Sequence, residues 1–407
     1  MNPRLPHARF AVFLCGCAAF LNLYATQSIL PAFAASFQVS ARQAGWSITV
    51  TTLAVAVTAP FVGRLTGRFE QRTVIAVAAL LLALPTLLTA YVDSFAELLV
   101  WRFVEGMLIP VVFATSVAYI GDRWRAASVT EITSLYVAGT VLGGFAGRFV
   151  SGVMTQYVGW REAFELLAVI SLLVGLLIVW LLPANPVARP GVTAVGMHGV
   201  RRLLRKPLLA AYGVGFCVLF SQVATFTYAG LYLSQAPFNL GAAALGTLYA
   251  VFLLALVVIP VAGRLSKSRP QSQLLTGAVA LGVCGSALTL LPSLWLIVLG
   301  LALSSTGVFL AQASANAYIA TTAGPDKSGA VGLYLTGYYL GGSAGAVAPA
   351  MLWNQWGWPG CVALVAGFQL LSLAIALLGW KPVKPQALIA GQRGKPARFH
   401  PIKDYER

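Results

Sequence analysis

Residues 135–147 read LYVAGTVLGGFAG, and residues 333–345 read LYLTGYYLGGSAG. The two stretches share Leu, Tyr, Gly, Leu, Gly-Gly, Ala and Gly at an offset of 198 residues. A second pair, PFVGRL at 60–65 and PVAGRL at 260–265, repeats at an offset of 200. Two matches at nearly equal offsets indicate that the second half of the chain repeats the first.

The composition places this repeat in a membrane. Of the 407 residues, 58% are hydrophobic and 9% are charged, whereas soluble proteins carry about 25% charged residues. A soluble enzyme, a disordered chain and a disulfide-rich miniprotein are therefore excluded, and a protein with a lipid-facing surface remains. The five cysteines lie in apolar stretches without a C-x-x-C pair, so neither a metal site nor a disulfide framework is expected.

Twelve apolar stretches are long enough to cross a bilayer, which takes about 20 residues in a helix. Backbone groups in lipid must be satisfied within the segment, and this favours helices. We predict an all-α membrane protein with twelve transmembrane helices in two parallel six-helix repeats. The predicted spans are 10–33, 46–66, 73–92, 97–119, 128–152, 163–182, 208–232, 241–263, 272–291, 293–318, 329–352 and 360–380.

The first span could instead be a signal peptide, because Arg4 and Arg9 precede it and Ala32-Phe33-Ala34 resembles a cleavage site. Its removal would leave an odd number of helices and spoil the repeat. We therefore keep it as a helix.

The positive charges set the expected orientation. Nearly all of the 27 Lys and Arg residues fall on the side of the N-terminus, and only Arg42 and Arg161 fall on the other. The positive-inside rule then places both termini in the cytoplasm. The net charge of +16 needs no nucleic acid to explain it. The predicted domains are a six-helix bundle at 1–183, a basic cytoplasmic linker at 184–207, a second bundle at 208–380 and a basic tail at 381–407.

No enzyme is expected. The string Gly341-Gly342-Ser343-Ala344-Gly345 matches a hydrolase nucleophile motif, but the three histidines that could serve as its base lie outside the predicted spans. The chain also lacks a P-loop, so ATP is not the expected energy source. We predict no cofactor and no metal site.

The connection between the second and third spans carries a family pattern. Residues 63–72 read GRLTGRFEQR, which resembles the G-x-x-x-D-R-x-G-R-R/K motif of the major facilitator superfamily of secondary transporters. The family acid that helps latch one conformation is replaced by Gly67, and Glu70 and Asp122 are the candidates to substitute for it. The motif residues assigned to conformational change are Gly63, Arg64, Arg68 and Arg72.

The resemblance extends over about residues 10–380. Arg102 followed by Gly106 matches a pattern of the fourth helix, and the Gly-rich fifth helix resembles bacterial drug/proton antiporters. It implies a monomeric inner-membrane carrier that exports small, moderately apolar organic molecules by alternating access, with protons as the coupling ion. Uptake or facilitated diffusion of a metabolite, lipid flipping and a non-transporting sensor remain alternatives.

Charged residues inside the spans are the candidates for proton coupling, because each costs about 2.5–3.5 kcal/mol at a helix centre. Arg102 and Glu105 share a helix face at i, i+3, and Arg148 and Glu165 are expected to join them at similar depth in one cluster. Leu301 and Ala346 replace the two arginines in the second repeat. The cluster is either an ion network that fixes helix register or a proton site with Glu105 as the carrier.

Glu131 is a second candidate for the proton carrier. It lies near the cytoplasmic end of its predicted span, where Arg123 or Arg125 could simply pair with it.

Polar and aromatic residues of spans 1, 7, 10 and 11 mark a shared central cavity, because such groups avoid lipid. The candidate substrate residues are Asn22, Tyr24, Gln27, Gln222, Thr225, Tyr228, Gln312, Asn316, Tyr334 and Tyr338.

Two glycine stripes lie at four-residue spacing on spans 5 and 11, and small residues let helices approach closely. They either pack statically or form one seam on which the halves rock. The stripe residues are Gly139, Gly143, Gly147, Gly337, Gly341 and Gly345.

Overall fold

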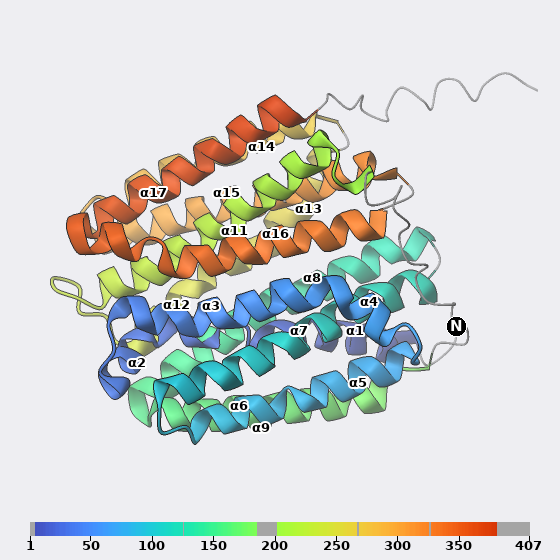
Figure 1. Cartoon of the computed structure of the whole chain (residues 1–407), viewed down its shortest axis with the longest axis horizontal. Coiled ribbons are helices and arrows are strands. Elements are labelled where there is room, and N and C mark those ends of the chain that lie inside the picture. Colours follow the sequence, from blue (N-terminus) through green and yellow to red (C-terminus); the bar gives the residue numbers. More distant parts are fainter. Residues whose placement is uncertain (1–4, 125, 185–201, 267, 325–326, 381–407) are drawn as a thin grey trace, which may run out of the picture.

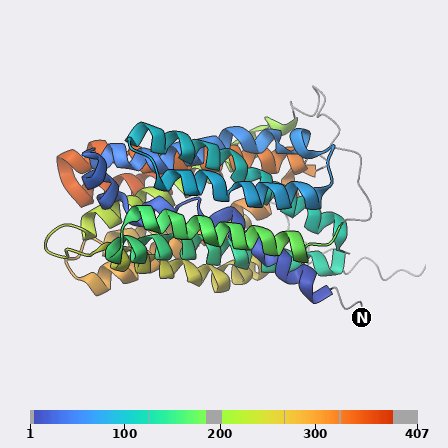
Figure 2. The same cartoon turned by 90° about the horizontal axis from the view of Figure 1, so that it is seen from below.

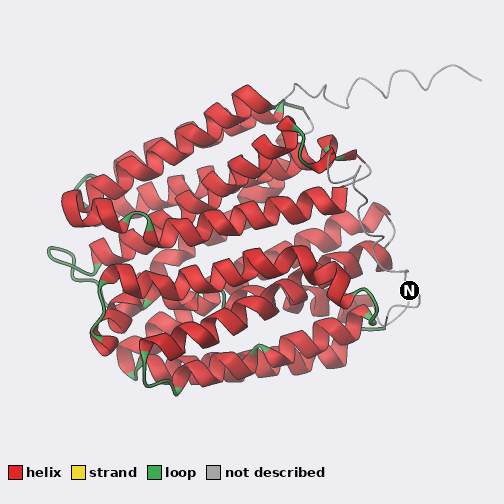
Figure 3. Cartoon of the chain, in the orientation of Figure 1, coloured by secondary structure: helices red, strands yellow, loops and turns green. Residues whose placement is uncertain are grey.

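The computed structural model describes residues 5–124, 126–184, 202–266, 268–324 and 327–380. Within these ranges the chain is helical with short connections and no strand (Figure 3). The predicted linker and tail lie mostly outside the described residues. The elements are α1 (Leu5–Leu21), η1 (Ala25–Ser28), α2 (Leu30–Phe37), α3 (Ala41–Thr58), η2 (Ala59–Phe61), α4 (Val62–Thr66), α5 (Gln71–Leu81), α6 (Ala83–Ala90), α7 (Phe95–Arg123), α8 (Ala126–Tyr157), α9 (Trp160–Leu181), α11 (Lys206–Leu233), α12 (Ala242–Leu248), η3 (Tyr249–Leu254), α13 (Ala255–Leu265), α14 (Gln271–Leu288), α15 (Leu294–Thr322), α16 (Lys327–Val347) and α17 (Ala350–Gly379).

Each predicted span coincides with one helix or with a run of consecutive helical segments. Among the described residues, nine helical segments are long and apolar enough to cross a membrane. The remaining three predicted spans correspond to α1–α2, α14 and α16. The prediction of an all-α membrane fold is confirmed.

The helices run side by side along the long axis in both views (Figures 1 and 2). Most of the first half, α1–α9, fills the lower part of Figure 1, and most of the second half, α11–α17, fills the upper part. The start of α1 and the end of α17 lie at the same end of the molecule (Figure 1). We call this the terminal end and the opposite one the far end.

Several spans are interrupted where the sequence breaks the helix. The first span breaks after Leu21, and a 3-10 turn leads into α2, which has Pro31 in its first turn. Proline is tolerated there because its missing N–H would be unsatisfied anyway. In α17, Gly357 takes a φ of +60°, a left-handed conformation that favours glycine, and separates a short helical segment from the predicted last span.

The glycine stripes pack within each half and do not contact each other, which agrees with the static-packing alternative. A Cβ at Gly143 would stand 2.6 Å from the carbonyl oxygen of Cys17 on α1, and Gly139 and Gly147 meet the same helix. In the second half, Gly345 and its stripe meet α11 in the same way. Each stripe packs the fifth helix of its own half against the first helix of that half, so the two stripes contact different helices.

This packing makes a stability prediction. The substitution Gly147→Ala should destabilise the protein by about 1–3 kcal/mol. The added Cβ would overlap the backbone of Leu21, which cannot move away without shifting α1. Gly277→Ala on α14 is the matched control, since no atom lies within 4 Å of the added carbon. Thermal unfolding of both variants in detergent checks the difference. Equal midpoints would contradict the proposed contact.

Candidate functional site

The most deeply buried charges of the described residues form one ion pair on α7. Arg102 and Glu105 are both fully buried, and Arg102 Nη1 donates to Glu105 Oε2. Thr86 on α6 donates its hydroxyl to the other carboxylate oxygen at 2.8 Å. The pair that the i, i+3 spacing predicts is therefore present, and it faces the protein interior.

Arg102 also donates hydrogen bonds to the break in the first span. Arg102 Nη2 donates to the carbonyl oxygens of Asn22 and Leu23, both at 3.0 Å. Both residues follow the end of α1 at Leu21, where the chain leaves the helix, and the Asn22 oxygen also accepts from the N–H of Ala25 at 3.2 Å. One guanidinium thus links Glu105 by hydrogen bonds to the segment that carries Tyr24 and Gln27.

Arg148 occupies a different site, where the two halves meet. Its Nε donates to Gln27 Oε1 at 2.9 Å, and its Nη1 donates to the carbonyl oxygen of Gly144 at 2.6 Å. The guanidinium carbon lies 4.6 Å from the ring centre of Tyr24, 4.8 Å from that of Tyr249 and 5.1 Å from that of Phe252. The last two rings belong to η3 in the second half.

The expected cluster of two arginines and two glutamates does not form among the described residues. Arg148 has no ion pair with Glu105, and Glu165 is half-buried and lies near Tyr91 after α6. Helical counting gives depth along the axis but not direction around it, so residues of equal depth can face different neighbours.

Glu131 lies at the terminal end. It is exposed and pairs with Arg9, with 3.3 Å between Nη1 and Oε1. Arg123 instead donates to the carbonyl oxygen of Ala184, and Arg125 lies outside the described residues. Exposed pairs like that of Arg9 and Glu131 contribute little stability.

The candidate substrate residues fall into three groups. Some are tied to protein partners: Asn22 donates to Ser171 at 2.8 Å, and Tyr228 donates to the carbonyl oxygen of Ala346 at 3.3 Å. Gln312 and Tyr338 are half-buried, and Asn316 is exposed. Among the described residues, buried side-chain atoms without a hydrogen-bond partner occur in the third group, which is Tyr24, Gln222, Thr225 and Tyr334, and also at Oδ1 of Asn22.

Polar contacts join the halves directly. Gln27 donates to Thr227 Oγ1 at 3.0 Å, and the hydroxyls of Thr52 and Ser343 lie 2.8 Å apart. Close backbone approaches between the halves occur toward the far end, where Gly152 on α8 meets Gly246 on α12. The sequence motif around Ser343 therefore serves a contact between helices.

The comparisons with known proteins agree with this architecture. The family model described as Major Facilitator Superfamily matches residues 12–346, which is most of the chain.

The chain belongs to the major facilitator superfamily.

Its relatives in the superfamily are transporters, so the expectation that it is no enzyme is confirmed. The inner membrane transport protein YnfM of Escherichia coli is 30% identical over 382 residues, covering 93% of this chain and 90% of that protein. The purine ribonucleoside efflux pump NepI of Shigella sonnei is 25% identical over 57% of this chain and 58% of its own. The solved structure of a bacterial homolog of the human lysosomal transporter Spinster, inward-facing and unoccupied, is 14% identical, with a TM-score of 0.75, and covers 94% of this chain and 100% of that one.

The superfamily loop motif retains contacts despite its missing acid. Gln71 donates to Asp122 Oδ2 at 2.9 Å, which ties the loop to the end of α7. Glu70 accepts a hydrogen bond from Thr73 on its own helix at 3.2 Å, and Arg72 donates to the carbonyl oxygen of Val179 at 3.0 Å. Of the two candidate substitutes, Asp122 is the one that links separate elements.

The other motif positions carry fewer contacts. Gly63 and Arg68 are exposed, and the side chain of Arg64 lies outside the described residues.

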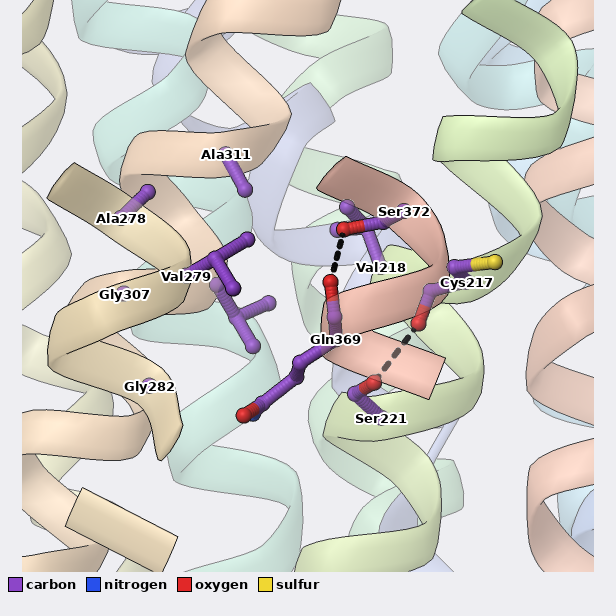
Figure 4. Close-up of a pocket in the computed structure, with 11 residues that line it drawn as sticks. Cys217, Val218, Ser221, Ala278, Val279, Gly282, Gly307, Ala311, Gln369 and Ser372 are labelled. Atoms are coloured by element: carbon purple, nitrogen blue, oxygen red, sulfur yellow. Dashed lines mark hydrogen bonds between the residues drawn. The ribbon is translucent and has the colours of Figure 1, made fainter. Parts of the chain in front are cut away.

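A small cavity lies inside the second half of this superfamily member, between α11, α14, α15 and α17 (Figure 4). Its volume of about 10 Å³ suits about one water molecule. Figure 4 shows Gln369 reaching across it toward Gly282. None of the predicted substrate residues lines it.

Sequence reasoning missed the second-half partners of Arg148, which are Tyr249 and Phe252, and the hydrogen-bond donor Thr86. Their apolar or neutral side chains cannot be told by residue type from the other residues of the predicted spans. The break at η3 follows no proline or glycine pattern that marks it in the sequence.

Proposed function

We propose that this membrane transporter exports small, moderately apolar organic molecules by alternating access, in antiport with protons. The supporting observation is the buried Arg102–Glu105 pair, because it is linked by hydrogen bonds to the α1 break that contacts the second half. Similarity to NepI, a purine ribonucleoside efflux pump, supports export as the direction.

The coupling follows from the cost of an unpaired buried charge. With Glu105 ionised, Arg102 is neutralised and bridges to the break in the first span. A proton on Glu105 removes the ion pair and leaves the guanidinium buried without a counter-charge, which costs several kcal/mol. A rearrangement of the break relieves this cost. Because Gln27 lies on the break and bonds Thr227, such a rearrangement changes the contact between the halves.

The moving parts in this proposal are the bundles 1–183 and 208–380. The terminal end faces the cytoplasm of a bacterial inner membrane, so that close approach at the far end, at Gly152 and Gly246, closes the path to the outside. One charge crossing the membrane supplies about 2.3 kcal/mol per 100 mV, enough to sustain a useful gradient of substrate.

Proteoliposomes test the proposal. With an acidic lumen they should accumulate at least one solute from a panel of aromatic amines, aromatic carboxylates and purine ribonucleosides, and a protonophore should end the accumulation. Protein-free liposomes are the control. Accumulation that needs an alkaline lumen would indicate proton-coupled uptake instead, and accumulation that a protonophore leaves unchanged would rule out coupling.

A reversible crosslink tests alternating access. The hydroxyl oxygens of Thr52 and Ser343 are 2.8 Å apart, which brings cysteines at these positions near the distance for a disulfide. Oxidation of the double variant Thr52→Cys/Ser343→Cys should reduce transport at least tenfold, and a reductant should restore it. The single variant Thr52→Cys is the control for crosslinks between the introduced cysteine and a native one. Full transport with the crosslink formed would refute motion at this contact.

A further inference from the structure

The buried charges of the described residues do not balance. Three charged side chains are buried: Arg102, Glu105 and Arg148. Glu105 neutralises Arg102, whereas Arg148, which is 5% exposed, has no carboxylate among its neighbours. The titratable groups that act on it are the phenols of Tyr24 and Tyr249. The interior therefore retains a positive charge at the contact between the halves, although an unpaired buried ion is costly.

The guanidinium of Arg148 has donors to spare. It presents five N–H groups, of which two are used, by Gln27 and by the carbonyl oxygen of Gly144. Within the described residues Nη2 makes no hydrogen bond. An arginine fork with free donors matches the two oxygens of a carboxylate better than any neutral group.

The surroundings of Arg148 indicate which chemical groups a bound molecule would carry beside its carboxylate. The rings of Tyr24, Tyr249 and Phe252 lie against the guanidinium from both halves. The hydroxyl of Tyr24 is buried and has no hydrogen-bond partner within the described residues. Aromatic faces favour a flat apolar body, and a phenol supplies one neutral donor beside it.

We infer that Arg148 binds the anionic group of the transported molecule, so that the substrates are organic acids with a carboxylate and a flat apolar body. This inference rests on the proposed transport function and narrows its substrate class. The bond to Gln27 adds a consequence, because a carboxylate on the free donors of Arg148 binds the same guanidinium as the amide that joins the halves through Thr227. Substrate binding thereby acts on the same contact as the proton.

Equilibrium binding to the purified full chain in detergent, at one pH and without any gradient, tests this inference. The probes are benzoate, 2-naphthoate and hexanoate, each beside its neutral amide, and intrinsic fluorescence reports binding. At least one aromatic acid should bind at least about tenfold more tightly than its amide. Arg148→Gln should remove this preference, and Arg148→Lys, which keeps the charge but not the fork, should retain part of it.

Arg161→Gln is the matched control, because Arg161 also stacks on an aromatic ring, that of Trp160, but lies outside the contact between the halves. It should bind like the original chain. If no acid exceeds its amide, or if Arg148→Gln keeps the preference, the inference is overturned and Arg148 is a structural contact between the halves. This outcome leaves proton-driven transport intact, and a failure of proton coupling would not change the binding result.

Discussion

Replacing Glu105 with Gln should abolish pH-driven transport. Like a proton on Glu105, it leaves Arg102 without its counter-charge, so we also expect a loss of several kcal/mol in stability. Glutamine has nearly the same shape, and its amide oxygen can accept the hydrogen bond that Thr86 donates to the carboxylate. It cannot gain or lose a proton at neutral pH, so the gradient would no longer act on this position. We expect at least a hundredfold loss of accumulation driven by an acidic lumen, because a carrier without its coupling proton can only equilibrate its substrate.

The measurement compares proteoliposomes that contain the variant with those that contain Glu131→Gln. Glu131 is exposed and pairs with Arg9, so its loss should leave transport unchanged. Exchange of substrate without a gradient should persist in Glu105→Gln, which separates lost coupling from lost binding. Normal pH-driven accumulation by the variant would remove Glu105 from the mechanism.

Arg102→Met should destabilise the protein by about 3–5 kcal/mol, because it leaves the carboxylate of Glu105 buried with Thr86 as its remaining partner. The double variant Arg102→Met/Glu105→Met should recover most of this loss, since apolar side chains of similar volume can replace a buried pair at little cost. Thermal unfolding of both variants in detergent gives the comparison.

The exposed pair of Arg9 and Glu131 offers the matched control for this cycle. Arg9→Met should change stability by less than about 1 kcal/mol. A double variant that is no more stable than Arg102→Met would mean that the two side chains do not act as a pair.

The sequence predicts the helices and the repeat well because both depend on local properties. Apolar length sets the spans, and the repeat preserves glycine stripes that each half needs for close helix packing. The i, i+3 spacing also predicts the contact between Arg102 and Glu105, since their separation is fixed by helix geometry.

The rest of the site depends on neighbours that the sequence does not reveal. A glycine face accepts any helix, so the stripe at Gly143 did not reveal whether α1 or the other half packs on it. Arg148 was expected beside Glu105, yet it faces Tyr249 on a segment about 100 residues away in the chain, because rotation around the axis of α8 is set by packing.

The glycine packing inside each half has a mechanical consequence. Backbones in direct contact leave little room for sliding, so each half should behave as a stiff body. The junction has such contacts toward the far end, as at Gly152 and Gly246, and also includes weaker side-chain bonds such as those of Gln27 and Thr52. Hydrogen bonds in membranes average about 0.6 kcal/mol each, which is close to thermal energy. The compliance of the molecule is therefore expected at these side-chain contacts, and in the proposed mechanism the free energy of binding one proton is enough to shift the equilibrium between two conformations.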